Sequence, residues 1–589
     1  MRPTKPVRPN NLNHRIKLMY GLVITVLAIF TVRLFYLQVI RHEYYRTEAL
    51  AKQLKQYEIQ PERGAISAHD GTQTVPLVLN ETYYTIYVDP VYISDRAKAA
   101  VAIAGIIGGD AKTYEQQMSG KNRYEVLAKR VDKDKKQKVL DLKLEGVGSQ
   151  AQPYRVYPQG SLAAQLLGFV NDEGQGKYGL EQALNDDLKG KAGRLKAITD
   201  ASGVPLAASR GNTKTDPIPG KKITLTIDIN MQRQAEDILK AGLDAAKSGS
   251  GSALIMDPNT GAIKAMANYP SYNPAEFFKV EDQNLFNNAN VSSPLEVGSI
   301  MKPLTVAAAL QQGAIKVSDE YDDPGFFKID NAVVENVEEV AGAAHRTVTD
   351  ILTRSLNTGA TWVLMQMGGG EINEKARVAW HDYMVNHYQL GKLTGIEQGY
   401  EAEGSIPDPK DGFGLNIQYA NTSFGQGLTA TPLQMGAALS SIINGGTYYR
   451  PHLVESVTDK DGKTTVKKPE SVKTGVISDK VSGEIRSLME AVVNRNHAVY
   501  KLQTIPAGYS IGGKTGTAQI TKPEGGYYED KYNGMFYGFV GGDNPQYVIV
   551  VRVNEPKIPG YAGSQAAGPI FSNLAVMLIN NFNVAPKTR

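Results

Sequence analysis

A serine and a lysine three residues apart, Ser299 and Lys302, are the first candidates for chemistry in this chain of 589 residues. Pro303 is tolerated only in the first turn of a helix, so the spacing predicts a helix that begins close to Ser299. Both side chains then lie on one helix face, and the helix N-terminus favours a developing oxyanion. A lysine is a base at neutral pH only when burial and a nearby cation lower its pKa. Because serine and lysine are common, this pair requires further groups, including a second cation.

Two later segments supply those groups. Ser355 and Asn357 add a hydroxyl and an amide, directly after an amphipathic segment, residues 345–354, that we expect to be helical. Residues 512–518 add Lys514 as the second cation, together with hydroxyls and strand amides that can hold a carboxylate. The three segments together predict one nucleophilic site.

The elements that position this site indicate an α+β domain over residues 216–589. Helical periodicity dominates residues 299–495, whereas strands are expected on both sides of that stretch. A sheet assembled from the two ends of a domain, with helices inserted between them, is an α+β layered architecture. The expected strands are residues 223–227, 253–256, 262–267, 536–540 and 547–553, and the expected flanking helices are residues 230–247 and 569–581.

Residues 41–215 carry no plausible catalytic cluster and are predicted to form a separate, non-catalytic pedestal. Strand-like runs such as residues 83–88 alternate there with charged helical stretches such as residues 129–143. Residues 209–220 are polar and rich in turn-forming types, which places the domain boundary at residues 215 and 216.

The N-terminus predicts a single-pass membrane anchor. Residues 1–17 carry five basic and no acidic side chains, and the apolar residues 18–40 are long enough to span a bilayer if Arg33 reaches the far interface. A secretory signal peptide is the alternative, but the apolar run ends without a small-residue cleavage site. The positive-inside rule then places residues 1–17 in the cytoplasm and residues after 40 outside the membrane.

Composition excludes several classes of function. The formal net charge of +4 and the 21% of charged residues do not suit a nucleic-acid-binding protein. No cysteine is present, which excludes disulfides, thiolate metal sites and cysteine nucleophiles. The 8 histidines are scattered and form no zinc-binding pair, so we expect neither a metal nor another cofactor.

The order of the three segments, S-x-x-K, S-x-N and K-T-G, resembles the penicillin-binding serine transpeptidases. The likeness extends over residues 20–580 and is closest to the class B, monofunctional peptidoglycan D,D-transpeptidases of septal synthesis. It implies an antiparallel sheet flanked by helices, with an inserted helical subdomain, on an elongated pedestal. Further segments that resemble this class are Arg33 to Gln38, Arg63 to Ile66, Tyr178 to Glu181, Thr226 to Asp228, Ser423 to Gly427 and Thr431 to Gln434.

The resemblance implies a role for each motif residue. Ser299 is the acylated nucleophile, Lys302 its general base, and Ser355 the proton relay to the leaving amine. Asn357 binds the peptide amide of the substrate, and Lys514 tunes the site.

The K-T-G segment adds the substrate contacts. Thr515 and Thr517, on either side of Gly516, grip the terminal carboxylate, and the backbone amides of Ser299 and Thr517 form the oxyanion hole. The implied reaction acylates the serine with D-alanyl-D-alanine, and an amine of a second stem peptide resolves the acyl-enzyme.

The same resemblance implies the partners and the location. These are peptidoglycan stem peptides, β-lactams as covalent inhibitors, the bacterial inner membrane, and a polytopic lipid II polymerase with other division proteins. An elongation transpeptidase, and a non-enzymatic scaffold or β-lactam sensor of the same fold, are alternatives. For the pedestal, the alternative to partner binding is a role as a spacer only.

Two other motifs compete with this interpretation. A second Lys-Thr-Gly at residues 473–475 is followed by Val476 rather than by a hydroxyl residue, and is interpreted as a surface loop. Residues 508–515 match the G-x-x-x-x-G-K-[ST] phosphate-binding pattern, which requires a helix directly after the lysine. The chain after Thr517 instead predicts a strand and a turn.

Overall fold

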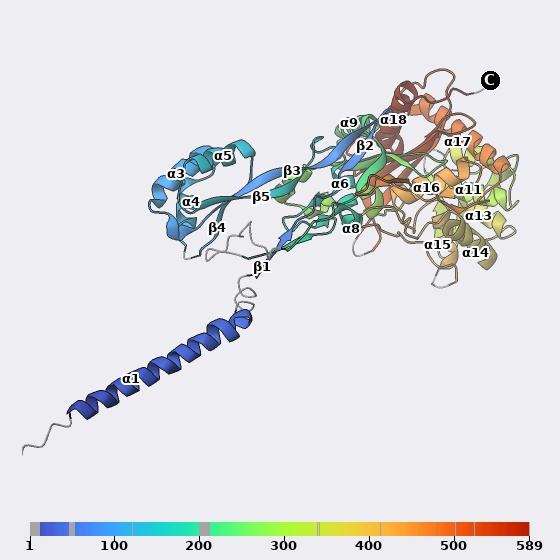
Figure 1. The fold of residues 1–589 in the computed structure, drawn as a ribbon. Helices are drawn as coiled ribbons and strands as arrows, with labels where there is room; N and C mark the ends of the chain where they lie inside the picture. The colour runs from blue at the N-terminus through green and yellow to red at the C-terminus, as the bar shows by residue number, and fades with distance from the viewer. Residues whose placement is uncertain are drawn as a thin grey trace, which may run out of the picture. The chain divides into compact units, whose positions relative to one another are not determined.

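The computed structural model describes residues 12–45, 54–120, 122–198, 213–337, 340, 342–410, 412, 414–500, 502–522 and 525–587 (Figure 1). Residues 1–11 of the predicted tail and residues 209–212 at the predicted boundary lie outside the described residues. The chain divides into two compact units, Met1–Pro61 with Lys191–Ile218, and Glu62–Gly190 with Pro219–Arg589.

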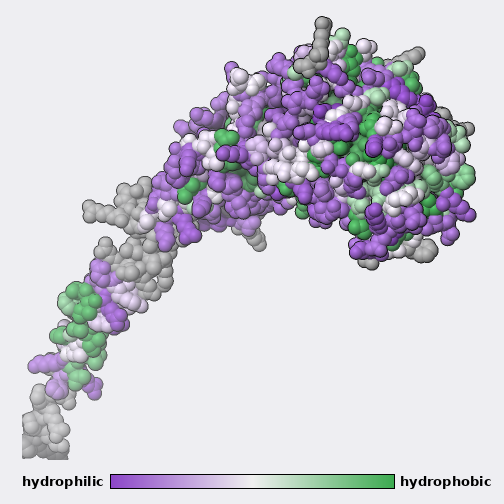
Figure 2. All heavy atoms as spheres, turned by 90° about the vertical axis from the view of Figure 1, so that its right-hand side faces the viewer, coloured by the Kyte–Doolittle hydropathy of each residue, from purple (hydrophilic) through white to green (hydrophobic). Residues whose placement is uncertain are grey.

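The first unit contains a long apolar helix and a small sheet. Helix α1 (Leu12–Phe35) continues into a π-helical turn, η1 (Tyr36–Ile40), and Figure 2 shows hydrophobic side chains along it. The stretch His14–Ile40 is 27 residues long and contains a window of 18 residues with a mean hydropathy of 2.1 and no buried residue, so it fits the predicted anchor. The three-stranded antiparallel sheet has the order β1 (Leu54–Ile59), β8 (Gly193–Ile198) and β9 (Thr213–Thr215).

In the second unit, a seven-stranded sheet combines strands that come before the predicted boundary at residues 215 and 216 with strands that come after it. Its central strand β10 (Lys222–Asp228) pairs in parallel with β2 (Ile66–Asp70) and antiparallel with β18 (Val454–Thr458). Helices α3, α4 and α5 cover a small apolar core at the far end of β3. The other elements of this region are β3 (Gln73–Val88), β4 (Glu125–Val131), β5 (Val147–Val156), β19 (Thr464–Val466), η2 (Pro90–Tyr92), α3 (Arg96–Ile107), α4 (Ala111–Gln117) and α5 (Lys133–Asp141).

A five-stranded antiparallel sheet carries the predicted site, in the order β12-β11-β23-β22-β21. Successive side chains of a strand point to opposite faces, so Ile549 and Val551 pack with α9 and α18, whereas Val548 and Val550 pack with the inserted helices. This arrangement confirms the predicted α+β class. The elements are β11 (Ser250–Met256), β12 (Ile263–Tyr269), β21 (Ile511–Thr521), β22 (Tyr527–Val540), β23 (Tyr547–Asn554), α9 (Ile229–Ala245), η8 (Ala562–Ala567) and α18 (Gly568–Asn581).

Helices dominate the insertion between β12 and β21, as predicted, but three short two-stranded sheets interrupt them. The helical elements are η5 (Gly298–Met301), α11 (Lys302–Gln311), α12 (Val348–Thr353), α13 (Asn357–Met367), α14 (Glu374–Asp382), η7 (Tyr383–His387), α15 (Leu415–Ser423), α16 (Pro432–Ile443) and α17 (Asp479–Tyr500). The sheets pair β13 (Glu320–Asp323) with β16 (Ala344–Thr347), β14 (Phe326–Ile329) with β15 (Ala332–Glu335), and β17 (Tyr448–Tyr449) with β20 (Ser471–Lys473).

Short elements complete the second unit. They are β6 (Phe169–Val170), β7 (Gly176–Lys177), α6 (Ala164–Leu167), α7 (Gly179–Ala183), α8 (Asn185–Leu188), η3 (Pro274–Lys279), η4 (Gln283–Phe286) and α10 (Ala289–Ser292).

Two predicted helices begin later than expected. Residues 129–131 end strand β4, and the helix begins at Lys133 because the Asp132 side chain accepts a hydrogen bond from the Lys135 N–H. His345 lies in strand β16, so its prediction as a helix residue is wrong. Helix α12 begins at Val348 because Thr347 and Asp350 form a reciprocal capping box.

Candidate active site

Ser299 lies in the 3₁₀ turn η5, and α11 begins three residues later at Lys302, which confirms the predicted helix start. Gly298 has a φ of +58°, and a Cβ at this position would lie 2.7 Å from the Thr517 carbonyl oxygen. Only glycine fits both conditions without strain. The turn that presents the Ser299 hydroxyl therefore lies directly against the backbone of β21.

Lys302 gathers the first two motif segments around one amine. Its Nζ lies 2.9 Å from the Ser299 Oγ, 2.6 Å from the Ser355 carbonyl oxygen and 2.8 Å from the Asn357 Oδ1. The side chain is 0% exposed, and burial, followed by the nearby Lys514 cation, places the pKa of Lys302 well below its usual value. A neutral amine has two N–H donors and one lone pair. It can donate to the two carbonyl-type oxygens while it accepts the proton of the Ser299 hydroxyl.

Ser355 connects the two lysines. Its Oγ lies 3.2 Å from the Lys302 Nζ and accepts a hydrogen bond from the Lys514 Nζ at 2.9 Å. The residue has a φ of +58°, a backbone conformation that L-residues rarely adopt and that is common at functional sites. Asn357 is the first residue of α13, and its Nδ2 donates to the Glu335 carbonyl oxygen at 3.1 Å. The S-x-N segment thus places one hydroxyl and one amide beside the lysine pair.

Lys514 reaches the same point from the sheet. It lies within β21, is 1% exposed, and also donates to the Thr515 carbonyl oxygen at 3.0 Å. Burial, followed by the Arg495 cation, lowers the pKa of Lys514 to about 7. Because its strand continues to Thr521 and no helix follows, the phosphate-binding interpretation of residues 508–515 is wrong.

In β21, Gly516 faces the opposite side of the strand from Thr515 and Thr517. A Cβ at Gly516 would lie 2.7 Å from the Val297 carbonyl oxygen, so the strand packs tightly against the loop that precedes Ser299. Thr515 and Thr517 are half-buried. The Thr517 Oγ1 accepts a hydrogen bond from the Gly563 N–H at 3.0 Å, which leaves the hydroxyl proton available to donate. The structure therefore brings Ser299, Lys302, Ser355, Asn357 and Lys514 together, with Thr515, Gly516 and Thr517 beside them.

Three further residues lie near this group. The ring of Phe424 lies 5.9 Å from the Lys302 Nζ, and the Gly425 carbonyl accepts from the Gly298 N–H at 2.9 Å. Arg495 donates to the Thr353 carbonyl oxygen at 3.1 Å, two residues before Ser355. The sequence singled out residues 423–427 without a role, and nothing in the helical periodicity of residues 299–495 distinguished Arg495.

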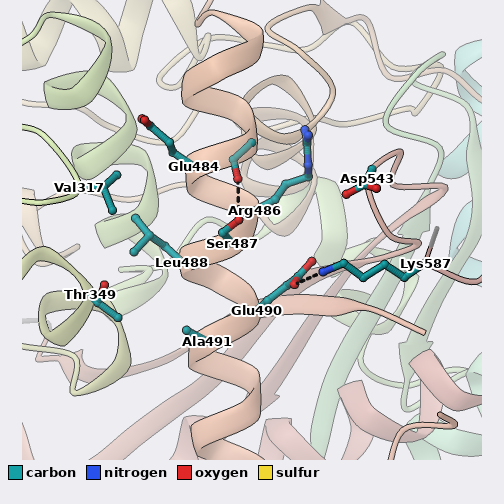
Figure 3. A pocket seen from close by; sticks show the side chains of 11 residues that line it. Val317, Thr349, Glu484, Arg486, Ser487, Leu488, Glu490, Ala491, Asp543 and Lys587 are labelled. Carbon is teal, nitrogen blue, oxygen red and sulfur yellow. Dashed lines mark hydrogen bonds and ion pairs between the residues drawn. The ribbon is translucent and has the colours of Figure 1, made fainter. Parts of the chain in front are cut away.

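Other candidate features lie elsewhere. A cavity of about 530 Å³ lies along α17, and none of the predicted site residues lines it (Figure 3). His345 is exposed, and hydrogen bonds to Asp322 and Glu320 raise its pKa. Lys473 ends the short strand β20, and the two residues after it lie in an exposed turn. In the part of the chain that the structure describes, no three histidine or acidic side chains are placed so that they could hold one metal ion.

Comparison with known proteins agrees with this geometry. The family model "Penicillin binding protein transpeptidase domain" matches residues 251–575, and "Penicillin-binding Protein dimerisation domain" matches residues 58–225. Stage V sporulation protein D of Bacillus subtilis is 30% identical over 99% of this chain and 88% of its own length. Peptidoglycan D,D-transpeptidase FtsI of Escherichia coli is 28% identical over 98% of this chain and 93% of its own.

Solved structures share the fold. Penicillin Binding Protein 2X from Streptococcus thermophilus superposes with a TM-score of 0.71 at 22% identity, and covers 91% of this chain and 83% of its own. Penicillin binding protein 3 of Mycobacterium tuberculosis, complexed with aztreonam, has a TM-score of 0.67 at 24% identity, over 90% and 98% of the two chains. Since the transpeptidase model covers more than half of the chain and a full-length relative reaches 30% identity, this chain belongs to the class B penicillin-binding proteins.

Proposed function

We propose that this protein is a serine-type peptidoglycan D,D-transpeptidase that crosslinks stem peptides during septal cell-wall synthesis. One observation carries the chemistry, namely the fully buried Lys302 amine 2.9 Å from the Ser299 hydroxyl and beside a second buried lysine. The relatives named transpeptidase and the family model for this domain support the same activity.

In the acylation step, neutral Lys302 takes the proton of Ser299, and the serine Oγ attacks the carbonyl carbon between the two D-alanines. The backbone amides of Ser299 and Thr517 stabilise the oxyanion of the tetrahedral intermediate. The C–N bond then breaks, and the proton passes from Lys302 through Ser355 to the nitrogen of the departing D-alanine. The Lys302–Ser355–Lys514 contacts provide this route.

In the second step, an amine of a neighbouring stem peptide attacks the acyl-enzyme ester and releases Ser299. Two steps through one covalent intermediate give ping-pong kinetics. Asn357 holds the amide of the donor peptide, and Lys514 keeps the pKa of Lys302 low. Thr515 and Thr517, with Gly516 between them, hold the terminal carboxylate.

The proposal extends to location, domains and partners. The tail, residues 1–17, lies in the cytoplasm, residues 18–40 cross the inner membrane, residues 41–215 form the pedestal, and residues 216–589 form the catalytic domain outside. The pedestal and anchor contact a polytopic lipid II polymerase and division proteins. β-Lactams acylate Ser299 as substrate mimics, a proposal supported by the relative complexed with aztreonam.

Labelling of the full-length protein with a fluorescent penicillin tests the acylation. We expect one covalent adduct by intact mass in the wild type and none in Ser299→Ala. Ser292→Ala is the matched control, because its hydroxyl donates to the Asn288 carbonyl at 2.8 Å. Labelling of Ser299→Ala at the wild-type level would refute the assignment. Labelling without crosslinking of stem peptides would favour the sensor or scaffold alternative.

A further inference from the structure

Glu296, three residues before Ser299, holds its carboxylate between two other segments of the chain. Its Oε1 accepts hydrogen bonds from the Gly427 N–H and from the Tyr527 hydroxyl, each at 2.9 Å. Its Oε2 is buried and has no hydrogen-bond partner within the described ranges. A buried carboxylate oxygen without a donor is unfavourable, so this placement calls for a reason beyond folding stability.

The first of these two segments is bound firmly to the nucleophile loop. Leu295 and Ala430 exchange two backbone hydrogen bonds at 3.1 Å, and the Gly298 N–H donates to the Gly425 carbonyl at 2.9 Å. A Cβ at Gly425 would lie 1.9 Å from the Gly298 carbonyl oxygen, so the two backbones are in close contact. The main chain on both sides of Glu296 is therefore fixed, and its side chain projects from a rigid base.

The second segment is the start of β22. Tyr527 pairs with Thr521 at the end of β21, four residues after Thr517. The hydrogen bond from Tyr527 to Glu296 thus connects the loop that carries Ser299 to the strand pair that carries Thr517. These are the two backbone segments whose amides form the proposed oxyanion hole.

We propose that Glu296 is a positioning residue that sets the spacing between the Ser299 and Thr517 amides through its bond to Tyr527. Oxyanion donors act only when they are held within about 0.5 Å of the productive geometry. This inference rests on the proposed acylation of Ser299. It concerns the rate of the acyl-transfer step and not the affinity of the noncovalent complex, because the Glu296 Oε1 already accepts two hydrogen bonds and its Oε2 is buried.

The test measures the rate constant of acylation and the dissociation constant of the preceding complex separately, by stopped-flow with a fluorescent penicillin on the full-length protein. Tyr527→Phe removes only the bridging hydroxyl, and we expect acylation to slow about ten-fold, as for one lost hydrogen bond to a charged group, with an unchanged dissociation constant. Tyr532→Phe is the matched control, because that hydroxyl of the same strand bonds the Glu529 carbonyl.

Variants at Glu296 separate a positioning role from a general structural one. Glu296→Gln keeps an oxygen that accepts from both donors and should retain most of the wild-type acylation rate. Glu296→Ala should acylate as slowly as the double variant Glu296→Ala/Tyr527→Phe. Wild-type acylation in Tyr527→Phe would overturn the inference, even if Glu296→Ala fails to fold. Failure of the wild type to label would refute the proposed function instead.

Discussion

At the scale of single residues, the two lysines differ in what surrounds them. Lys302 is buried among neutral oxygens with the Lys514 cation nearby, so burial and repulsion both place its pKa well below the usual value. Lys514 is also buried, beside the Arg495 cation, and its pKa falls to about 7. Because Lys514 repels a proton on Lys302, it favours the neutral form of the Lys302 amine, which is the form that the proposed base requires.

This burial predicts a pH-dependent stability. The unfolded chain binds protons on these lysines more tightly than the folded protein, so folding stability falls as pH falls, for Lys514 from about 10.5 to about 7. Lys302→Met replaces the buried amine with an apolar side chain of similar length. We expect it to abolish penicillin labelling, to raise stability at pH 7 by an amount on the order of 1 kcal/mol, and to weaken the pH dependence.

Urea unfolding of wild type and Lys302→Met at pH 6, 7.5 and 9 measures this difference. The stability advantage of Lys302→Met should fall as pH rises, because less free energy is needed to deprotonate the buried lysine on folding as pH approaches the unfolded pKa of 10.5. A constant gap at all three pH values would contradict the assignment of a neutral Lys302.

At the scale of elements, the site forms where one strand meets the N-terminal ends of two helices. The N-terminal ends of α11 and α13 supply the first two motifs, and β21 supplies the third. Gly516 permits this contact, since its α-carbon faces the Val297 carbonyl oxygen and the Ile300 side chain. A side chain at this position would separate β21 from the turn that carries Ser299.

Gly516→Ala is therefore predicted to slow acylation strongly. The new Cβ would lie 2.7 Å from the Val297 carbonyl oxygen, which is too close without a backbone shift. A displacement near 1 Å at reacting groups costs about 100-fold in rate. Gly249→Ala is the control, because nothing lies within 4 Å of its added Cβ. Equal labelling rates in both variants, measured with fluorescent penicillin, would show that β21 tolerates the shift.

At the scale of the whole second unit, a buried ion network joins strand β5 and the segment before β2 to the short helix α7. Glu181 in α7 is 0% exposed and pairs with Arg63 ahead of β2 and with Arg155 in β5. Arg155 also donates to the Gly64 carbonyl at 2.7 Å. Strand β2 pairs with β10, and β10 precedes the helices that carry the candidate site. The network therefore lies close to the place where these two strands, which lie far apart in the chain, pair in one sheet.

Removal of Glu181 should destabilise the protein severely. Glu181→Ala leaves two buried guanidinium groups without a counter-charge, which costs about 3–5 kcal/mol. Asp172→Ala is the matched control, because it breaks an exposed ion pair with Lys129 that contributes at most about 1 kcal/mol. Urea denaturation followed by circular dichroism measures both. A loss below about 1 kcal/mol in Glu181→Ala would mean that water replaces the missing carboxylate.

The local sequence pattern predicted an element correctly where the apolar face given by its helix or strand periodicity is also the face that packs against neighbouring elements. The helix that starts near Ser299, strands β11, β12 and β23 and the apolar N-terminal helix were found within a few residues. Strand β22 instead begins at Tyr527, well before the expected residue 536, and the expected strand at residues 223–227 belongs to the seven-stranded sheet as β10. The errors at residues 129–131 and at His345 have a common cause. In both cases a distant strand pairs with the segment, β3 with β4 and β13 with β16, and a side-chain cap then starts the helix later.

By itself, the sequence determined which chemical groups the candidate site contains, because S-x-x-K, S-x-N and K-T-G supply hydroxyls, an amide and two amines by residue type and order. Only the tertiary structure decided that the pKa values of both lysines are lowered, because desolvation and repulsion depend on segments that lie far apart in the chain. The bond between Glu296 and Tyr527 is of the same kind, since it joins residues that no local pattern relates.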